Sequence, residues 1–275
     1  MQISPRYDGP AVLDVDGVGD PSVALMRQRR RLVDALTKLD DAQWASPSRC
    51  DAWNVQDVIA HLAGTDQYWA LSFSSALRSE PTRFLVGFDP VATPASMVER
   101  TRAQTPQEVL AGFQTNVENI GEIVEGLDDG QWSMPAEAPP GHVALRVAAL
   151  HALWDAWVHE RDVMIPLGLP VDDEADELEL ILRYAAGLSS AFYAARGSTQ
   201  TGSFVVEASD PRLRLEVHAG PVVRVTDADK DGDAALTGRA ADLIDALSYR
   251  APLNHALSDD DAWMLRGLGE VFEKV

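Results

Sequence analysis

The sequence has 275 residues and a formal net charge of −20, from 43 acidic and 23 basic side chains. So acidic a chain argues against nucleic acid or an anionic membrane as the main partner, because both select basic surfaces. A hydrophobic content of 46% with 24% charged residues is typical of a globular protein, and the length suggests one large or two ordinary domains.

Other sequence features narrow the class of protein. The single cysteine, Cys50, excludes an intrachain disulfide framework and any multi-cysteine zinc module. No run approaches the roughly 18 consecutive apolar residues of a membrane span. Residues 1–21 are polar and lack the basic-then-apolar layout of a signal peptide. We therefore expect a soluble, cytoplasmic protein.

The first part of the chain is typical of a helical bundle. After a loose arm over residues 1–21, apolar residues at three- and four-residue intervals predict four long helices. These lie at 22–38, at 54–73, at 106–126 and at 143–165. Ser22, Asn54 and Thr105 are the expected caps. In such bundles, metal sites are built from inward side chains on facing helices.

The pattern changes in the second part. A helix at about 173–196 is expected to connect the two parts, within a segment 169–197. Beyond it, β-branched runs broken by Asp-Pro and Gly-Pro turns predict strands, followed by helices at about 238–248 and 261–273. The expected domains are therefore a bundle over 22–168 and an α+β domain over 198–275.

A basic run in the first helix and the single cysteine both have ordinary interpretations. The basic run Arg27 and Arg29–Arg31 is interpreted as a solvated helix face. Cys50, in a loop with no base fixed near it in sequence, is interpreted as a small buried hydrophobe.

The fourth helix carries a polar stripe beside its apolar one: His151, Asp155, His159 and Asp162. Because residues four apart are neighbours on a helix, Asp155 can close on one metal ion with either His159 or His151. A polar stripe inside a bundle is costly to bury unless it has a partner. Taken alone, His61 on the second helix is more often a core histidine than a ligand.

Three segments resemble one known family. The stretch 54–64, following 50–53, resembles the histidine-bearing helix of the mycothiol-dependent maleylpyruvate isomerase family, which belongs to the DinB-like metal-binding bundles. The stretch 155–162 resembles its second metal segment, in which an acidic residue precedes a histidine by four. The tail around 233–247 resembles its sterol-carrier-like C-terminal domain. The resemblance implies an α+β fold: a DinB-like four-helix bundle, then a smaller sterol-carrier-like α+β domain.

The same resemblance implies a site. It makes His61, Asp155 and His159 the ligands of one divalent metal ion, with Zn²⁺ the expected metal. The family has Glu where this chain has Asp155, so His151 is an alternative ligand, or a hydrogen-bonding support for Asp155. Arg250 matches an arginine near the family's domain junction and is expected to be catalytic by holding a substrate carboxylate.

The implied function is thiol chemistry on a small electrophilic or unsaturated substrate. Mycothiol would be the co-substrate and would react as a metal-bound thiolate, in a transferase or an isomerase. Two alternatives stay open: a non-enzymatic protein that binds or sequesters a small molecule, and a metal-dependent hydrolase that activates water.

Overall fold

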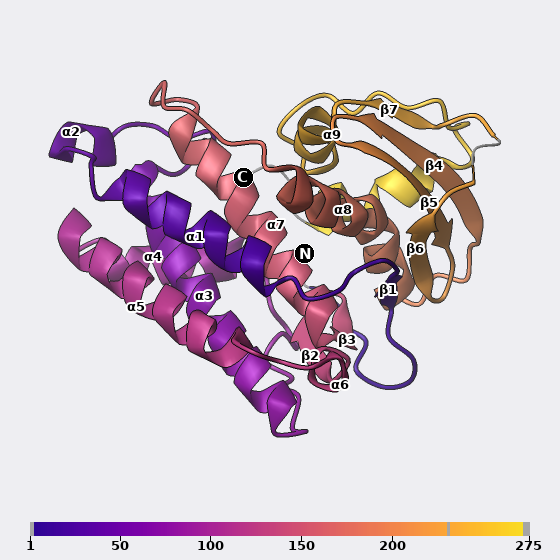
Figure 1. The fold of residues 1–275 in the computed structure, drawn as a ribbon, viewed down its shortest axis with the longest axis horizontal. Helices are drawn as coiled ribbons and strands as arrows, with labels where there is room; N and C mark the ends of the chain where they lie inside the picture. Colours follow the sequence, from indigo (N-terminus) through magenta and orange to yellow (C-terminus); the bar gives the residue numbers. More distant parts are fainter. Residues whose placement is uncertain (1–2, 230–231, 272–275) are drawn as a thin grey trace.

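The computed structural model describes residues 3–229 and 232–271. A group of long helices lies on one side and a five-stranded sheet with its helices on the other (Figure 1). One continuous cluster of buried hydrophobic residues runs through both parts. No described helix is long and apolar enough to cross a membrane.

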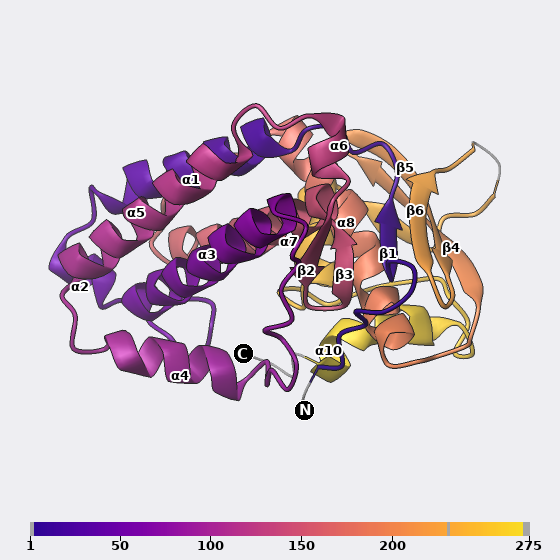
Figure 2. The same ribbon diagram turned by 90° about the horizontal axis from the view of Figure 1, so that it is seen from below.

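Four long helices form the bundle: α1 (Ser22–Leu36), α3 (Val55–Leu77), α5 (Pro106–Val124) and α7 (Leu145–Met164). Helix α3 packs against α5 and α7, and α1 packs against the same two helices, which closes the bundle. The expected caps at Asn54 and Thr105 are present, each as a reciprocal capping box. The expected cap at Ser22 is wrong: Ser22 is the first residue of α1, and the N-cap position is Pro21, with no side-chain cap bond. A shorter helix, α4 (Ala92–Thr101), lies against α3 (Figure 2).

Helix α7 is the central element, in contact with α1, α3 and α8. Apart from Arg146 and Asp155, which are half-buried, every residue of this helix is buried. Its two histidines and its charged residues therefore need partners inside the protein, because an unpaired polar group in the core is costly. Those partners build the site described below.

Short elements connect the long ones. The single helical turns are α2 (Asp41–Trp44) and α6 (Asp129–Trp132), and an antiparallel hairpin joins β2 (Pro135–Ala138) to β3 (Gly141–Ala144). The sequence predicts only a loop around this hairpin. Its pairing depends on distant residues: Gly141, with φ at +134°, lies so close to the Arg6 backbone that a Cβ would clash with it.

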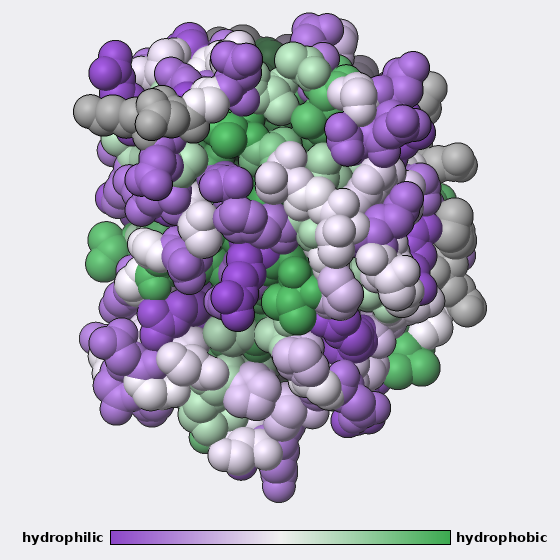
Figure 3. Space-filling view, turned by 90° about the vertical axis from the view of Figure 1, so that its right-hand side faces the viewer, coloured by the Kyte–Doolittle hydropathy of each residue, from purple (hydrophilic) through white to green (hydrophobic). Residues whose placement is uncertain are grey.

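The second part is a mixed sheet in the order β1-β6-β5-β4-β7. Strands β4 (Gly202–Ser209), β5 (Arg212–Ala219) and β6 (Val223–Asp227) are antiparallel, and β7 (Leu236–Gly238) pairs in parallel with β4. Alternate residues of β4 and β5 are buried. Helix α8 (Ala175–Ala195) packs against β5 and β6, and α9 (Ala240–Leu247) packs against β4 and β7. Figure 3 shows the sheet side of the molecule, where polar residues surround several separate hydrophobic areas.

The expectation of a loose arm over residues 1–21 is wrong for its described part, residues 3–21; residues 1 and 2 lie outside the described residues. Strand β1 (Leu13–Val15) completes the sheet by pairing in parallel with β6, and Val12, Leu13 and Val15 are buried (Figure 2). The partner strand lies about 200 residues further along the chain, so no local pattern announces the pairing. The sheet therefore combines β1, from the beginning of the described chain, with four strands that lie beyond residue 201.

The single helix expected over 261–273 is wrong, because the described part of this segment forms two short elements. A 3₁₀ turn, η1 (Ala262–Leu265), is followed by a short helix, α10 (Gly267–Val271). Both contact α8, and the Cβ of any larger residue at position 267 would meet the Ser189 carbonyl. Residues 272 and 273 of the expected helix lie outside the described residues.

Candidate metal centre

Helices α3 and α7 bring together the three predicted ligands. His61 comes from the second turn of α3, whereas Asp155 and His159 lie one turn apart on α7. His61 Nε2 is 3.9 Å from Asp155 Oδ2, and His159 Nε2 is 3.6 Å from Asp155 Oδ1. Each of the three residues offers a ligand atom within 4.8 Å of the other two.

This donor set fits a divalent metal ion. In a tetrahedral zinc site with bonds of 2.0–2.2 Å, neighbouring ligand atoms lie about 3.3–3.6 Å apart. His61 Nε2 and His159 Nε2 lie 3.9 and 3.6 Å from different oxygens of the Asp155 carboxylate, which is close to these separations. The shorter side chain of Asp155, compared with the Glu of the family pattern, still reaches both imidazoles.

The electrostatics of the metal-free site also favour a cation. Burial lowers the pKa of His61, against the effect of Asp155. Burial alone would raise the pKa of Asp155, but the His61 and His159 imidazoles hold it well below its usual range. Burial opposes charge on His159 too, yet its hydrogen bond to Asp162 and the nearby carboxylates raise its pKa to about 10. The carboxylates around His159 therefore favour positive charge at this ring.

Two neighbouring residues border this cluster. The Trp53 ring lies 5.1 Å from the His61 ring, centroid to centroid, and 6.5 Å from the His159 ring. The Thr65 hydroxyl, one turn beyond His61 on α3, donates to the Leu62 carbonyl at 3.1 Å, and its oxygen lies 3.5 Å from Asp155 Oδ2. Trp53, from the loop before α3, and Thr65, on α3, therefore lie beside the rings and the carboxylate.

The Nδ1 atom of His159 faces a second set of residues. It is 3.0 Å from Asp162 Oδ2, which also accepts a bond from Cys50 Sγ at 3.3 Å. Arg250 donates to both Asp162 oxygens, from Nε at 2.9 and 3.1 Å and from Nη2 at 2.8 Å. Arg49 Nε lies 3.3 Å from Asp162 Oδ1. One imidazole thus links the three-residue cluster to a charged junction.

Cys50, His159 and Asp162 also have ligand atoms within 4.8 Å of one another. The guanidinium of Arg250 already supplies positive charge there, with Nη2 3.6 Å from Cys50 Sγ. That charge disfavours a second cation at this side of His159. Cys50 is buried, as expected, and although no base is near it in sequence, His159 Nδ1 is 3.9 Å from its sulfur in three dimensions. No local signal could reveal a contact across 109 residues.

His151 belongs to neither group of potential ligands among the described residues. Its Nδ1 shares a 2.5 Å hydrogen bond with the Tyr184 hydroxyl of α8, and its ring packs against Trp69 and Trp154. Burial lowers its pKa to about 4, against the effect of Asp155. The structure therefore favours a neutral core histidine at this position, where the sequence left open a ligand or a support for Asp155.

Arg250 does reach the site, but its guanidinium is committed to Asp162. The sequence predicts a catalytic arginine that holds a substrate carboxylate; in the structure the carboxylate that it holds is the protein's own. Its side chain is 16% exposed and that of Asp162 is fully buried.

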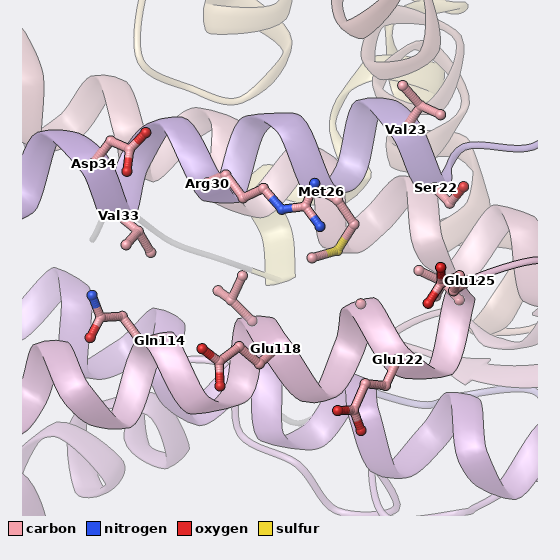
Figure 4. Close-up of a pocket in the computed structure, with 13 residues that line it drawn as sticks. Ser22, Val23, Met26, Arg30, Val33, Asp34, Gln114, Glu118, Glu122 and Glu125 are labelled. Atoms are coloured by element: carbon pink, nitrogen blue, oxygen red, sulfur yellow. The ribbon is translucent and has the colours of Figure 1, made fainter.

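A groove of about 700 Å³ lies elsewhere, between α1 and α5. Met26 and Arg30 of α1 face Gln114, Glu118 and Glu122 of α5 across it (Figure 4). None of the predicted ligands lines this groove.

The part of the chain that carries the site matches a known family. The family model of the mycothiol maleylpyruvate isomerase N-terminal domain matches residues 25–164, which is just over half of the chain and includes all three predicted ligands. The chain belongs to this family. No curated protein matches the sequence.

Solved structures of the family give the same fold. Two crystal structures of the mycothiol-dependent maleylpyruvate isomerase, one of them a histidine-to-alanine mutant, match with a TM-score of 0.60. Each match has 15% sequence identity and covers 85% of this chain and 90% of that one. A third match, YfiT from Bacillus subtilis, has a TM-score of 0.44 with 17% identity, over 62% of this chain and 98% of its own. The predicted α+β fold class, a helical bundle followed by a sheet-containing unit, is confirmed.

Proposed function

We propose that this chain is a metal-dependent enzyme that uses mycothiol as co-substrate, as an isomerase or an S-transferase for a small electrophilic or unsaturated substrate. The observation that carries the proposal is the convergence of His61, Asp155 and His159 within the part of the chain that matches the family. Family membership supports the thiol, and the donor set supports the metal.

The three residues would hold one divalent ion, and we propose zinc. Two imidazole nitrogens and one carboxylate form the kind of three-ligand set that catalytic zinc sites use, with a position left open for a substrate. Bound there, the ion would lower the pKa of a coordinated thiol and so supply a nucleophile at neutral pH.

Among the described residues, no thiol lies on the Nε2 side of the two histidines. Cys50, the single cysteine, is buried and lies on the Nδ1 side of His159, where its thiol donates to Asp162. The Nε2 atoms of both histidines point instead toward Asp155. An external thiol is therefore the simplest source of a nucleophile at the three-ligand centre.

The test is turnover of two probes by zinc-loaded protein, each with and without mycothiol. Maleylpyruvate reports isomerisation, and an electron-poor aryl halide reports S-transfer. We expect turnover of at least one probe that requires mycothiol and is lost in His61→Ala, while Cys50→Ser keeps most activity.

Other results would contradict the proposal. Equal rates with and without the thiol would indicate a hydrolase that activates water. Zinc binding with no turnover of either probe would favour a non-enzymatic binding protein. Full activity in His61→Ala would remove the proposed metal centre from the mechanism.

A further inference from the structure

The turn at the C-terminal end of α9 sets the direction of the Arg250 side chain, which extends toward α7. Tyr249 has a left-handed backbone conformation, with φ at +58°. Its N–H donates to the Ala246 carbonyl at 3.2 Å, and the Arg250 N–H donates to the Asp245 carbonyl at 2.8 Å. This pair of bonds is a Schellman motif, which usually has Gly at the left-handed position. The turn thus fixes the backbone from which the Arg250 side chain leaves.

Arg250 reaches across to Asp162 of α7 and to Cys50 in the loop before α3. Its bidentate bonds to Asp162 span 88 residues, and they are charge-assisted bonds to a fully buried carboxylate. Its Nη2 also lies 3.6 Å from Cys50 Sγ. The carboxylate that it holds is the one beside His159 Nδ1.

A second ion pair joins the same parts of the protein, with the acidic residue on α9 and the basic residue in the loop before α3. Asp245, on α9, pairs with Arg49 at 3.2 Å between Nη2 and Oδ1. The Arg49 N–H donates to the Asp162 carbonyl at 2.9 Å. The loop before α3, the end of α7 and the end of α9 are therefore held together around Asp162.

We propose that Arg250 is a positioning residue for the metal centre: through Asp162 it fixes the ring of His159, so that the sheet-containing unit sets the metal affinity of the bundle. This inference rests on the proposed metal binding by His61, Asp155 and His159. In this role Arg250 acts on His159, a metal ligand supplied by the protein, and contact with a substrate is not required.

The chemistry of the contact gives the reason. Asp162 can only accept hydrogen bonds while ionised, so it keeps a proton on His159 Nδ1 and leaves Nε2 to point at Asp155. Partners of this kind fix ring orientation and raise ligand basicity, and their loss typically costs about 10- to 100-fold in metal affinity. Without Arg250, Arg49, at 3.3 Å, would be the guanidinium left beside Asp162 among the described residues.

The test measures metal affinity in place of activity. Zinc dissociation constants are measured by competition with a chromophoric chelator, and the ligand field of the site is read from the absorption spectrum of the Co²⁺-loaded protein. The variants are Arg250→Ala, Arg250→Lys, Asp162→Asn and the double variant Arg250→Ala/Asp162→Asn. Arg250→Lys keeps a positive charge but not the bidentate geometry, so it tests the role even if Arg250→Ala folds poorly.

A matched control is an arginine of α1 that pairs with another buried carboxylate of α7. Arg31 also makes a bidentate pair with a buried carboxylate of α7, Glu160, at 2.9 and 2.8 Å, and its side chain is 18% exposed. Glu160 bonds to Gln28 and Arg31, on the side of α1. Arg31→Ala therefore disturbs the packing of α7 without touching Asp162.

We expect zinc to bind about 10- to 100-fold more weakly to Arg250→Ala and Asp162→Asn, with an altered Co²⁺ spectrum. The double variant should be no weaker than Asp162→Asn alone, Arg250→Lys should lie between wild type and Arg250→Ala, and Arg31→Ala should stay within about twofold of wild type.

Unchanged zinc affinity in Arg250→Ala, additive losses in the double variant, or an equal loss in Arg31→Ala would overturn this proposal alone. Failure of the wild-type chain to bind zinc would overturn the proposed metal-dependent function, and this proposal with it.

Discussion

Arg29 of α1 and Asp66 of α3 form an ion pair in the interior of the bundle. Nη2 of Arg29 lies 2.6 Å from Asp66 Oδ1, and each side chain is only 1% exposed. The Ala152 carbonyl of α7 accepts a further bond from Arg29. The basic run is predicted to be a solvated helix face, but one of its members, Arg29, lies in the core. Arg29 links three helices of the bundle, α1, α3 and α7.

The first prediction concerns this pair. Arg29→Met should lower the free energy of unfolding by about 3–5 kcal/mol, because it leaves Asp66 buried without its counter-ion. Adding Asp66→Leu should restore most of the loss. Urea unfolding of metal-free protein measures both variants. The control is Arg83→Met, whose partner Asp8 is exposed, with an expected cost below about 1 kcal/mol. A single-variant cost as small as that of the control would contradict the prediction.

The second prediction concerns Glu137, a fully buried carboxylate in β2. It accepts bonds from the backbone N–H groups of Phe84 and Leu85 and from the hydroxyls of Tyr7 and Thr82. Glu137→Gln replaces one accepting oxygen by a donor, which leaves at least one partner unpaired and should cost about 1–3 kcal/mol. Amide hydrogen exchange should become faster at Phe84 and Leu85. Unchanged exchange at both amides would show that the carboxylate does not hold this segment.

The third prediction concerns pH. The folded chain keeps the pKa of His151 at about 4, mainly because burial disfavours the imidazolium, whereas the unfolded chain has the ordinary value of 6.5. The unfolded state therefore takes up this proton first as the pH falls. The stability from His151 is present above pH 6.5 and is lost progressively down to pH 4, by up to about 3 kcal/mol.

Comparison with His151→Gln isolates this effect, because glutamine can still bond to Tyr184 but does not titrate. Urea unfolding of metal-free protein between pH 7 and pH 4 should show wild type losing more stability than the variant. Parallel pH dependences would mean that His151 is protonated in the folded protein.

The fourth prediction concerns the carboxylate ligand. Because Asp155 already lies 3.6 and 3.9 Å from the two imidazole nitrogens, its short side chain is compatible with binding. Asp155→Ala should weaken zinc binding by more than the roughly 100-fold typical of an outer partner. Asp155→Glu, which restores the residue of the family pattern, should stay within about tenfold of wild type. Zinc affinity by chelator competition measures both, and an equal loss in both variants would mean that the site is shaped for aspartate alone.

Local signals predicted much of the bundle. The capping residues of α3 and α5 and the uninterrupted run of α7 act within one helix, so the sequence shows them directly. The i, i+4 spacing of Asp155 and His159 is equally local. His61 could be joined to them only through the family resemblance, because its contact depends on how α3 packs against α7.

Residues with distant partners could not be predicted. Strand β1 pairs with β6, Arg29 pairs with Asp66, and Arg250 pairs with Asp162, each across a long stretch of chain. The local sequence around each partner is ordinary, since burial of a charge or pairing of a short strand is decided by the whole fold. The charged junction around His159 Nδ1 is therefore a property of the structure.

Metal stoichiometry is the most direct test of the central claim. Wild type, His61→Ala and His218→Ala are dialysed against zinc, freed of loose metal, and analysed by inductively coupled plasma mass spectrometry. His218 is the control, an imidazole on β5 whose side chain is 50% exposed. The account predicts one zinc per chain in wild type and His218→Ala and almost none in a folded His61→Ala. Equal zinc content in His61→Ala and wild type would contradict it.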